Sequence, residues 1–461
     1  MQRTLSVLCL ALSLTGCTLG PKYHRPVAAT PPSYRGASPT SEQPAASMAD
    51  LPWWEVFKDP ALQELVRTAL KQNYDLQLAS ERVTAARAQL GITRSAQYPQ
   101  VTGTGSFTGG KSISLFTSNY FMLAPDATFQ LDLFGGLRKA TEASRAQLLA
   151  TEEARSSVVL TLVGDVASYY FQLLTLDAQL TTAKSTVEAQ QASLRLTNLR
   201  LQYGTATRVD VLQAQQVLDT ANAQIPDLER QIAQTENALS ILVGRLPDAI
   251  RRGQLLTEQY LPPEVPAGLP SALLERRPDI RQAEQTLIAA NAEIGVARAA
   301  FFPTITLSAS PGGAFGQIET FVSGAPTHAG LWPYGVSVTQ PIFNAGQLRN
   351  QLRVTESQQR QAVLLYRQTI QRSFGEVSDA LTGYDKLREV RARQEASVKD
   401  LRENVKLSSE RYEKGITSYL EVLDAQRSLF GAEQILVQAR GNELQSLVTL
   451  YKVLGGGWKQ Q

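Results

Sequence analysis

The sequence is poor in the side chains that enzymes most often use for metal binding and nucleophilic catalysis. Its 461 residues include two histidines, His24 and His328, and two cysteines, Cys9 and Cys17. Neither cysteine has the spacing of a zinc site or of a disulfide framework. Paired carboxylates could still serve acid–base chemistry, but no pocket-forming pattern surrounds them. We therefore expect no enzyme, no bound metal and no cofactor.

Charge of one sign and long apolar runs are also scarce. The 45 Lys and Arg residues nearly balance the 42 Asp and Glu residues, and no basic stripe is interleaved with aromatic residues. This balance argues against nucleic acid as a partner. After Cys17 no apolar run approaches the ~18 residues of a membrane-spanning helix. Apolar residues nevertheless make up 43% of the chain, which is enough for a large core.

The N-terminal residues account for both cysteines. A mostly apolar run over residues 5–14 is too short to span a bilayer and is typical of a secretory signal. It ends in LTGC (14–17), which is similar to a bacterial lipobox, although an ordinary signal peptide with an incidental cysteine is the alternative. We expect residues 1–16 to be removed as a lipoprotein signal peptide and Cys17 to be lipidated. The proline-rich residues 17–52 then form an extended leader.

The folded body is an internal duplication. Residues 75–99 align with residues 279–303, and RLQYGTATRVDVLQAQ (200–215) aligns with RYEKGITSYLEVLDAQ (411–426). Long internal repeats of this kind indicate two copies of one structural unit. The predicted segments are a first copy at 53–250, a linker at 251–270, a second copy at 271–457 and a C-terminal tail at 458–461.

Each copy repeats one order of patterns: a helix, two strands, a very long helix and a return helix. Apolar and polar residues alternate in the strand segments, and glycine and proline punctuate their ends. The very long helices, over 137–203 and 346–414, have apolar residues three and four positions apart, as in coiled-coil seams. A helix of about 67 residues spans about 100 Å. The first helices are expected over 59–97 and 271–302, and the strands near 98–108, 126–134, 303–311 and 333–343.

The stretch GSFTGGKS (105–112) satisfies the nucleotide-binding pattern G-x-x-x-x-G-K-[ST]. A phosphate-binding loop must follow a strand and open a helix, whereas the residues after Ser112 alternate and include Pro125. The aligned residues of the second copy, 309–316, keep none of the four motif residues. We therefore interpret the match as chance, and expect its glycines to turn the chain where a strand ends and an external loop begins.

The strands predict a protein of several chains. Four strands cannot close a membrane barrel, which has no free edge and usually needs at least eight strands. Chains must therefore pool their strands, and a transport pore favours three or more chains, because eight-stranded barrels are filled by their own side chains. Two antiparallel helix pairs likewise make a hollow cylinder only beside pairs from other chains. The sequence thus predicts a mixed α and β membrane protein.

These features resemble the TolC-type outer-membrane factors, and among them the lipidated NodT-like branch that serves resistance–nodulation–division efflux systems. The resemblance covers about residues 51–458, and LLERRPDI (273–280) and LDAQRSLF (423–430) are its most specific parts. It implies a homotrimer with a twelve-stranded barrel in the bacterial outer membrane and a periplasmic α-helical coiled-coil barrel. It also implies a passive exit duct that docks on a periplasmic membrane-fusion adaptor and an inner-membrane resistance–nodulation–division transporter.

The turns between the long and return helices carry the candidate functional residues. Gly204 and Gly415 stand where a helix C-cap favours positive φ, and Glu421 and Asp424 share one helix face. Three chains converging there would ring an entrance with carboxylates, which select for cations. By the resemblance, the residues of the periplasmic gate are Asp210, Tyr412, Glu421 and Asp424, with Arg208 and Arg427 as possible tethers. Thr417 departs from the family, whose members often have an arginine there.

Alternatives to a multidrug exit duct remain open. These are a duct for type I secretion, a duct for heavy-metal export, and a lipid-anchored coiled-coil scaffold without a pore. The charged turn residues could also be solvated caps of surface helices. Three methionines and two histidines in the whole chain count weakly against a dedicated metal path. Conductance in a planar bilayer separates duct from scaffold.

Overall fold

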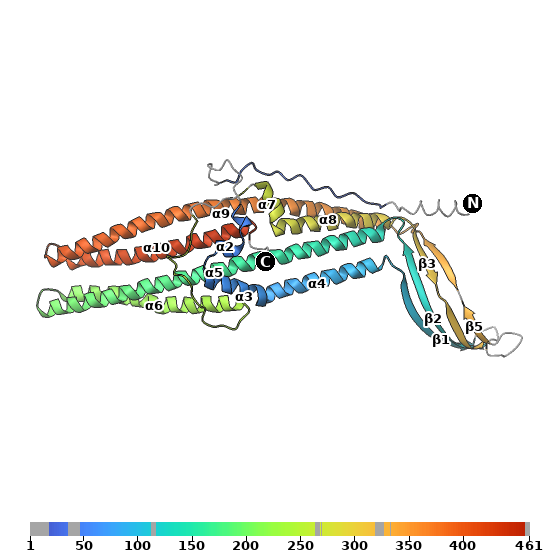
Figure 1. Ribbon diagram of the computed structural model, residues 1–461, viewed down its shortest axis with the longest axis horizontal. Coiled ribbons are helices and arrows are strands. Elements are labelled where there is room, and N and C mark those ends of the chain that lie inside the picture. Colours follow the sequence, from blue (N-terminus) through green and yellow to red (C-terminus); the bar gives the residue numbers. More distant parts are fainter. Residues whose placement is uncertain are drawn as a thin grey trace. The chain divides into compact units, whose positions relative to one another are not determined.

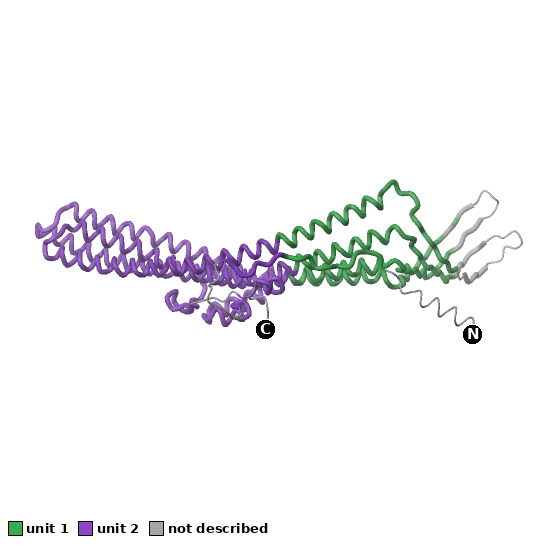
Figure 2. The backbone as a smooth tube through the Cα atoms, turned by 90° about the horizontal axis from the view of Figure 1, so that it is seen from above, with its two compact units in different colours: residues 1–28, 81–153, 282–368 green, residues 29–80, 154–281, 369–461 purple. Residues whose placement is uncertain are grey.

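The computed structural model describes residues 18–35, 47–111, 117–262, 268, 270–318, 327–331 and 333–456. Cys17, the predicted lipidation site, lies outside these residues. The chain divides into two compact units, each assembled from several segments (Figure 2). Unit 1 comprises residues up to 28, 81–153 and 282–368, and unit 2 comprises 29–80, 154–281 and 369–461. All described strands belong to unit 1, and both helical hairpins end in unit 2.

The order of elements repeats, as the internal duplication predicts (Figure 1). A 3₁₀ helix, η1 (Met48–Asp50), and a short α-helix, α2 (Trp53–Val56), precede the elements that repeat. The first copy consists of α3 (Pro60–Gln72), α4 (Tyr74–Ser95), β1 (Gln100–Lys111), β2 (Thr117–Leu131), α5 (Gly136–Gln202) and α6 (Arg208–Leu242). The second consists of α7 (Pro270–Arg276), α8 (Pro278–Ala299), β3 (Thr304–Ala309), β4 (Gly312–Ile318), β5 (Thr327–Leu331), β6 (Tyr334–Thr339), α9 (Gln347–Glu413) and α10 (Tyr419–Val453).

The first helix of each copy is broken, where the sequence predicted one continuous helix. In the first copy the break falls at Asn73, whose side-chain oxygen accepts a hydrogen bond from the amide of Leu76 at 2.9 Å and so caps α4. In the second copy it falls at Arg277, because the next residue, Pro278, disfavours helical backbone before it. Both breaks are therefore encoded by residues that end or start helices.

The six described strands make four long ones. β3 and β4 pair with β2 in a single register, from Leu131↔Ile305 to Ser118↔Ile318, and are separated only at residues 310–311. β5 and β6 pair in the same way with β4 and β3. Pro311 and Pro333 stand at the two interruptions, and proline removes a ladder donor. The four strands per chain that the sequence predicted are therefore confirmed.

The strands are longer than expected, which corrects the interpretation of GSFTGGKS. β2 begins at Thr117 rather than near 126, and β1 continues to Lys111. Gly105, Gly109 and Gly110 pair within the ladder with Leu123, Asn119 and Ser118 and do not turn the chain. Glycine is disfavoured in strands, which is why the pattern suggested an early end. β1 pairs with β2 from Gln100 to Lys111, so Gly105, Gly110 and Lys111 of the motif lie in a strand, and the next described residues, from Thr117, are again in a strand. This arrangement argues against a phosphate-binding loop, which needs a helix after the motif.

The sheet is open and has one apolar face. Its order places β1 at one edge and the β5/β6 strand at the other, and neither edge has a partner among the described residues. Large apolar side chains on alternate positions are exposed: Val101, Phe107, Phe121, Leu123, Tyr334, Val336 and Val338. Alternation of apolar and polar faces with two free edges is typical of strands that complete a membrane barrel with neighbouring chains.

Unit 2 has a continuous core to which both copies contribute. Tyr170 of α5, Leu62 of α3, and Leu447 and Tyr451 of α10 are among its largest fully buried side chains. One 18-residue stretch of α5 is apolar enough to cross a membrane, but 67% of it is buried inside the protein. We therefore assign that stretch to the core, where each large apolar side chain contributes about 1.5–3 kcal/mol.

Hydrogen bonds to Asp59 attach the loop after α6, at Gln254, to this core. The Asp59 carboxylate caps α3 through the amide of Ala61 at 2.8 Å, and it accepts hydrogen bonds from the Tyr170 hydroxyl at 2.8 Å and from the backbone of Gln254 at 3.0 Å. The amide of Gly253 in turn donates to the Tyr170 oxygen at 2.9 Å. A buried carboxylate satisfied in this way holds α3, α5 and the loop together.

The leader lies along unit 1 without helix or strand over residues 18–28. The amide of Leu19 donates to the carbonyl of Phe134 at 3.2 Å, and the side chain of Asn291 donates to the carbonyl of Pro21 at 3.0 Å. Arg25 forms an ion pair with Glu284 of α8. These contacts hold the leader against α8 and the start of α5.

Candidate functional site at the helical hairpin tips

Each hairpin turns through a glycine that the sequence singled out. Gly204 has φ +75° and Gly415 has φ +70°, a conformation that side chains with a β-carbon rarely adopt. The amide after each glycine reaches back to the helix: Thr205 donates to the carbonyl of Arg200 at 2.8 Å, and Ile416 to that of Arg411 at 2.9 Å. This C-cap closes the long helix and positions the next one.

The first tip is closed by a capping box. The side chain of Thr207 accepts the amide of Asp210 at 3.2 Å, while the Asp210 carboxylate accepts the amide of Thr207 at 2.7 Å and its hydroxyl at 2.8 Å. Asp210 thus satisfies the exposed amide of Thr207 at the start of α6, where a negative charge also complements the helix dipole.

The second tip has the same backbone but no capping box. Its N-cap residue, Ser418, makes no side-chain capping bond. The hydroxyl of Thr417 donates instead to the Glu421 carboxylate. Asp424 pairs with Arg427 at 2.8 Å, one turn along α10, and both side chains are exposed. The acidic groups of this tip are held by neighbours on their own helix or turn, and the N-cap side chain does not satisfy the first amides of α10.

Tyrosines and an arginine join the two hairpins near their tips. The rings of Tyr412 on α9 and Tyr419 on α10 lie 5.1 Å apart. The Arg200 guanidinium of α5 lies over the Tyr412 ring at 4.7 Å, a cation–π contact. The hydroxyls of Ser193 and Tyr419 are 2.6 Å apart and share a hydrogen bond. Figure 1 shows the two tips at the same end of the helices of unit 2.

The predicted gate residues therefore fall into separate groups. Tyr412 joins the hairpins, whereas Asp424 and Arg427 pair with each other. Arg208 is exposed, and no hydrogen bond or ion pair in the described residues joins it or Asp210 to the acidic residues of the second tip.

Three residues that join the hairpins, Arg200, Tyr419 and Ser193, were missed by sequence reasoning. Arg200 and Tyr419 lie inside the aligned segments 200–215 and 411–426, so an aromatic and a cation at a repeated turn were available signals. Ser193 is one of many serines on α5, and nothing in the sequence distinguishes it. Its hydrogen bond requires that Tyr419 of the other hairpin pack against α5. That packing cannot be inferred from the sequence around Ser193.

Comparisons with known proteins give one consistent result. A profile described as outer membrane efflux protein matches residues 65–245 and 269–456, and each match overlaps one of the two predicted copies. The chain is 36% identical over 454 residues to the cation efflux system protein CusC of Escherichia coli, covering 98% of each. It is 38% identical over 472 residues to the probable efflux pump outer membrane protein TtgC of Pseudomonas putida, covering 99% of this chain and 96% of the relative.

Solved structures agree with the fold. The open state of the Neisseria gonorrhoeae MtrE outer membrane channel superposes with a TM-score of 0.86 at 30% identity, covering 96% of this chain and 99% of the channel. A crystal structure of CusC superposes with a TM-score of 0.84 at 35% identity, covering 96% and 100%. The predicted fold class is confirmed: a mixed α and β outer-membrane channel, in which a trimer pools four strands per chain into a twelve-stranded barrel continued by an α-helical barrel.

Proposed function

Because this chain belongs to the outer membrane efflux protein family, we propose that its two hairpin tips form the periplasmic gate of the channel. The protein is an outer-membrane exit duct of a tripartite efflux system and extends into the periplasm. Its relatives are channel proteins rather than enzymes. The observation that carries the gate proposal is the contact of Arg200 with Tyr412, which joins the two hairpins of one chain beside the turns.

The gate acts by holding the second hairpin against the first. Arg200 and Ser193 on α5 contact Tyr412 and Tyr419 of the second hairpin, so a second hairpin that moves away from α5 must break both contacts. In a trimer, Asp210, Glu421 and Asp424 from each chain then ring the entrance and favour cations. Arg427 neutralises Asp424 in part, and we assign Arg208 the role of a tether to a neighbouring chain.

Partners open the gate and supply the energy. We propose a periplasmic membrane-fusion adaptor that docks on the hairpins and an inner-membrane resistance–nodulation–division transporter. The chain itself conducts passively. Cys17 is proposed as the lipid anchor, and Cys17→Ala tests this: radiolabelled palmitate should be incorporated by the unaltered protein and not by the variant.

Single-channel recording in planar bilayers tests the gate. Arg200→Gln removes the cation over Tyr412 and is expected to raise the resting conductance severalfold. Arg195→Gln on the same helix, at an exposed position, removes the same charge and should leave the conductance unchanged. Equal conductance in both variants and the unaltered protein would refute the role of the Arg200–Tyr412 contact in holding the gate closed.

The cargo is proposed as a range of small organic compounds, as for a multidrug pump. The TtgC relative is named for an efflux pump, and the CusC relative is named for cation efflux, so metal export is the second candidate. A deletion strain tested against antibiotics, dyes, detergents and metal salts distinguishes them. Sensitivity to metal salts alone would reverse the preference.

A further inference from the structure

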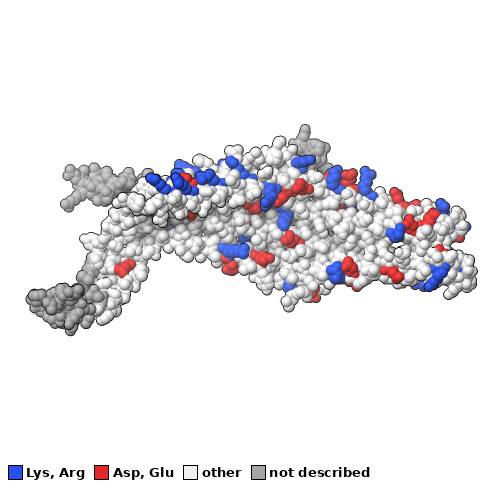
Figure 3. All heavy atoms as spheres, turned by 180° about the vertical axis from the view of Figure 1, so that it is seen from behind, with Lys and Arg blue, Asp and Glu red and all other residues white. Residues whose placement is uncertain are grey.

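The barrel strands carry almost no charge, and one carboxylate is the exception. Among the described strand residues, only Lys111 at the end of β1 and Asp126 within β2 are formally charged. Figure 3 shows that, on the face drawn, charged side chains gather over the helices and are sparse over the strands. A lone charge inside a membrane segment is costly unless it faces water or a partner.

The register places Asp126 on the polar face of the sheet. Asp126 lies opposite Thr102 in β1, whereas its neighbours in sequence lie opposite the apolar or small residues of the other face. The polar face continues through Thr128, Thr306, Ser308 and Ser337. Since barrel strands place apolar residues toward lipid and polar residues toward the interior, Asp126 faces the pore.

Two hydroxyls hold this carboxylate in place from opposite sides. Thr104 of β1 donates to one carboxylate oxygen, and Ser310 donates to the other. Ser310 stands at the interruption between β3 and β4, where Pro311 leaves the ladder without a donor. The partners are neutral, and no basic side chain is paired with Asp126 in the described residues, so its charge remains uncompensated.

We infer that the three Asp126 carboxylates of the trimer form a fixed negative ring inside the barrel that favours cationic over anionic solutes. The inference goes beyond the proposed gate, since it concerns the strands and not the hairpin tips. A ring of carboxylates lining a pore selects for cations by its field. Because the two hydroxyls restrict the side chain, the charges stay directed into the pore rather than folding back on the wall.

Reversal potentials of purified trimers in planar bilayers under a potassium chloride gradient test this ring. Asp126→Asn keeps the size of the side chain and is expected to lower the cation-to-anion permeability ratio severalfold. Asp126→Glu keeps the charge and should retain the ratio. Asp126→Ser, which can still share hydrogen bonds with Thr104 and Ser310, is the second neutral variant and should match Asp126→Asn.

An unchanged permeability ratio in either neutral variant, in trimers that conduct normally, overturns the inference. The gate is read from the conductance of Arg200→Gln and the ring from the reversal potential of the Asp126 variants. Either can therefore fail while the other stands. A trivalent cation added on the side of the bilayer to which the barrel opens should block the current less in Asp126→Asn than in the unaltered protein. Its block of Arg200→Gln should equal that of the unaltered protein.

Discussion

The two helical hairpins share a backbone and differ in chemistry. α5 and α9 each have 67 residues, and α6 and α10 each have 35, so every position of one hairpin has a counterpart in the other. Leu180 and Ile232 of the first hairpin pack on an apolar cluster. Their counterparts are Arg391 and Glu443, which form an ion pair with Glu443 only 1% exposed.

The neighbouring pair reverses its charges. Lys184 pairs with Glu229 at 3.3 Å in the first hairpin, and their counterparts pair as Glu395 with Arg440 at 2.9 Å. Glu395 also accepts a hydrogen bond from Arg391 at 2.9 Å. The second hairpin thus contains a four-residue network, Arg391, Glu395, Arg440 and Glu443, where the first has an apolar seam and one exposed pair.

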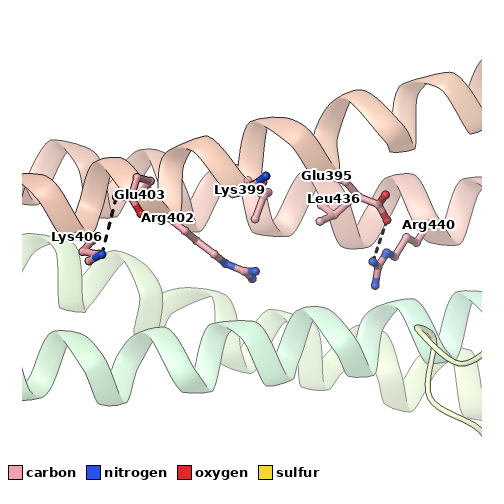
Figure 4. A pocket seen from close by; sticks show the side chains of 8 residues that line it. Glu395, Lys399, Arg402, Glu403, Lys406, Leu436 and Arg440 are labelled. Atoms are coloured by element: carbon pink, nitrogen blue, oxygen red, sulfur yellow. Dashed lines mark hydrogen bonds and ion pairs between the residues drawn. The ribbon is translucent and has the colours of Figure 1, made fainter.

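The network borders a polar groove that continues along α9. Glu395 and Arg440 line one end of this groove of about 440 Å³, and Arg402 and Lys406 line the other (Figure 4). The duplication therefore preserves the path of the helices. The side chains packed between the long helix and the return helix can be apolar or ionic, provided that each buried polar group has a partner.

The largest expected loss of stability comes from removing one member of the buried ion pair in this network. Glu443→Ala leaves Arg391 without its buried partner, and loss of one member of a buried ion pair costs about 3–5 kcal/mol. We expect the denaturant midpoint of the purified protein, followed by helical circular dichroism, to fall markedly. Lys184→Ala, in the exposed pair of the first hairpin, should barely move it.

Placing the apolar residues of the first hairpin at the counterpart positions of the second tests whether the two seams are equivalent. The double variant Arg391→Leu/Glu443→Ile replaces the buried ion pair by the apolar pair of the counterpart positions, and such replacements are often neutral or stabilising. Its midpoint should therefore return to that of the unaltered protein or exceed it. A double variant as unstable as Glu443→Ala would show that the two seams are not equivalent in packing.

The helix breaks give a second comparison with a smaller effect. The side chain of Asn73 donates to the carbonyl of Leu242 at 2.9 Å, and Arg277 donates to Val453 at 3.1 Å, the counterpart position at the end of the return helix. Arg277 also binds Asp279 and Glu376, each at 2.7 Å. We expect Arg277→Ala to cost about 3 kcal/mol and Asn73→Ala about 1 kcal/mol in unfolding free energy. Equal midpoint shifts would mean that the ion pairs of Arg277 contribute nothing.

Tyr170 and its counterpart Leu381 give the third comparison. Both are buried, but only Tyr170 holds a loop, through Asp59 and Gly253. Tyr170→Phe removes a hydrogen bond to a carboxylate and should cost about 2 kcal/mol. Leu381→Met, a shape change without a polar group, should cost less than about 1.5 kcal/mol. If Tyr170→Phe lowered the unfolding free energy by no more than Leu381→Met, Tyr170 would not anchor the loop.

The same anchor predicts a pH dependence. Burial alone raises the pKa of Asp59, but hydrogen bonds from Gln259, Tyr170 and two backbone amides outweigh it and hold the pKa below its usual value. A lowered pKa in the folded state contributes stability that is present above the unfolded value, about 3.9, and is lost as pH falls through the folded value. Asp59→Asn should therefore flatten the loss of stability below about pH 4, as measured by midpoints across pH.

The architecture was accessible from the sequence because its signals are long and repeated. The heptad seams of α5 and α9, the alternation in the strands and the aligned turns at Gly204 and Gly415 each carry a periodicity that local physics enforces. Strand ends were not accessible. The glycines at 109 and 110 look like a turn, and they lie in β1 only because β2 pairs with them.

The site was accessible only in part, for a related reason. Asp210, Glu421 and Asp424 were identified from repeat position and charge, which are local properties. That Asp210 is engaged in a capping box follows from Thr207 three residues before it and was a readable signal that went unused. The contacts of Arg200 and Ser193 with the second hairpin are long-range, and no pattern within one helix reports them.

Substitutions at the hairpin tips should change the unfolding free energy least and the channel conductance most. Asp210→Ala removes a capping box and should cost about 1 kcal/mol, whereas Asp424→Ala removes an exposed intrahelical pair and should leave the midpoint almost unmoved. Asp424→Ala alone should raise the resting conductance, and the Asp210→Ala/Asp424→Ala variant further, because each substitution removes a carboxylate through which the proposed gate is held closed. Thr207→Ala is the matched control: it removes the same cap as Asp210→Ala but keeps both carboxylates, so its conductance should stay at the resting value. If the double variant conducts no more than Thr207→Ala, Asp210 is a helix cap alone and neither carboxylate belongs to the gate.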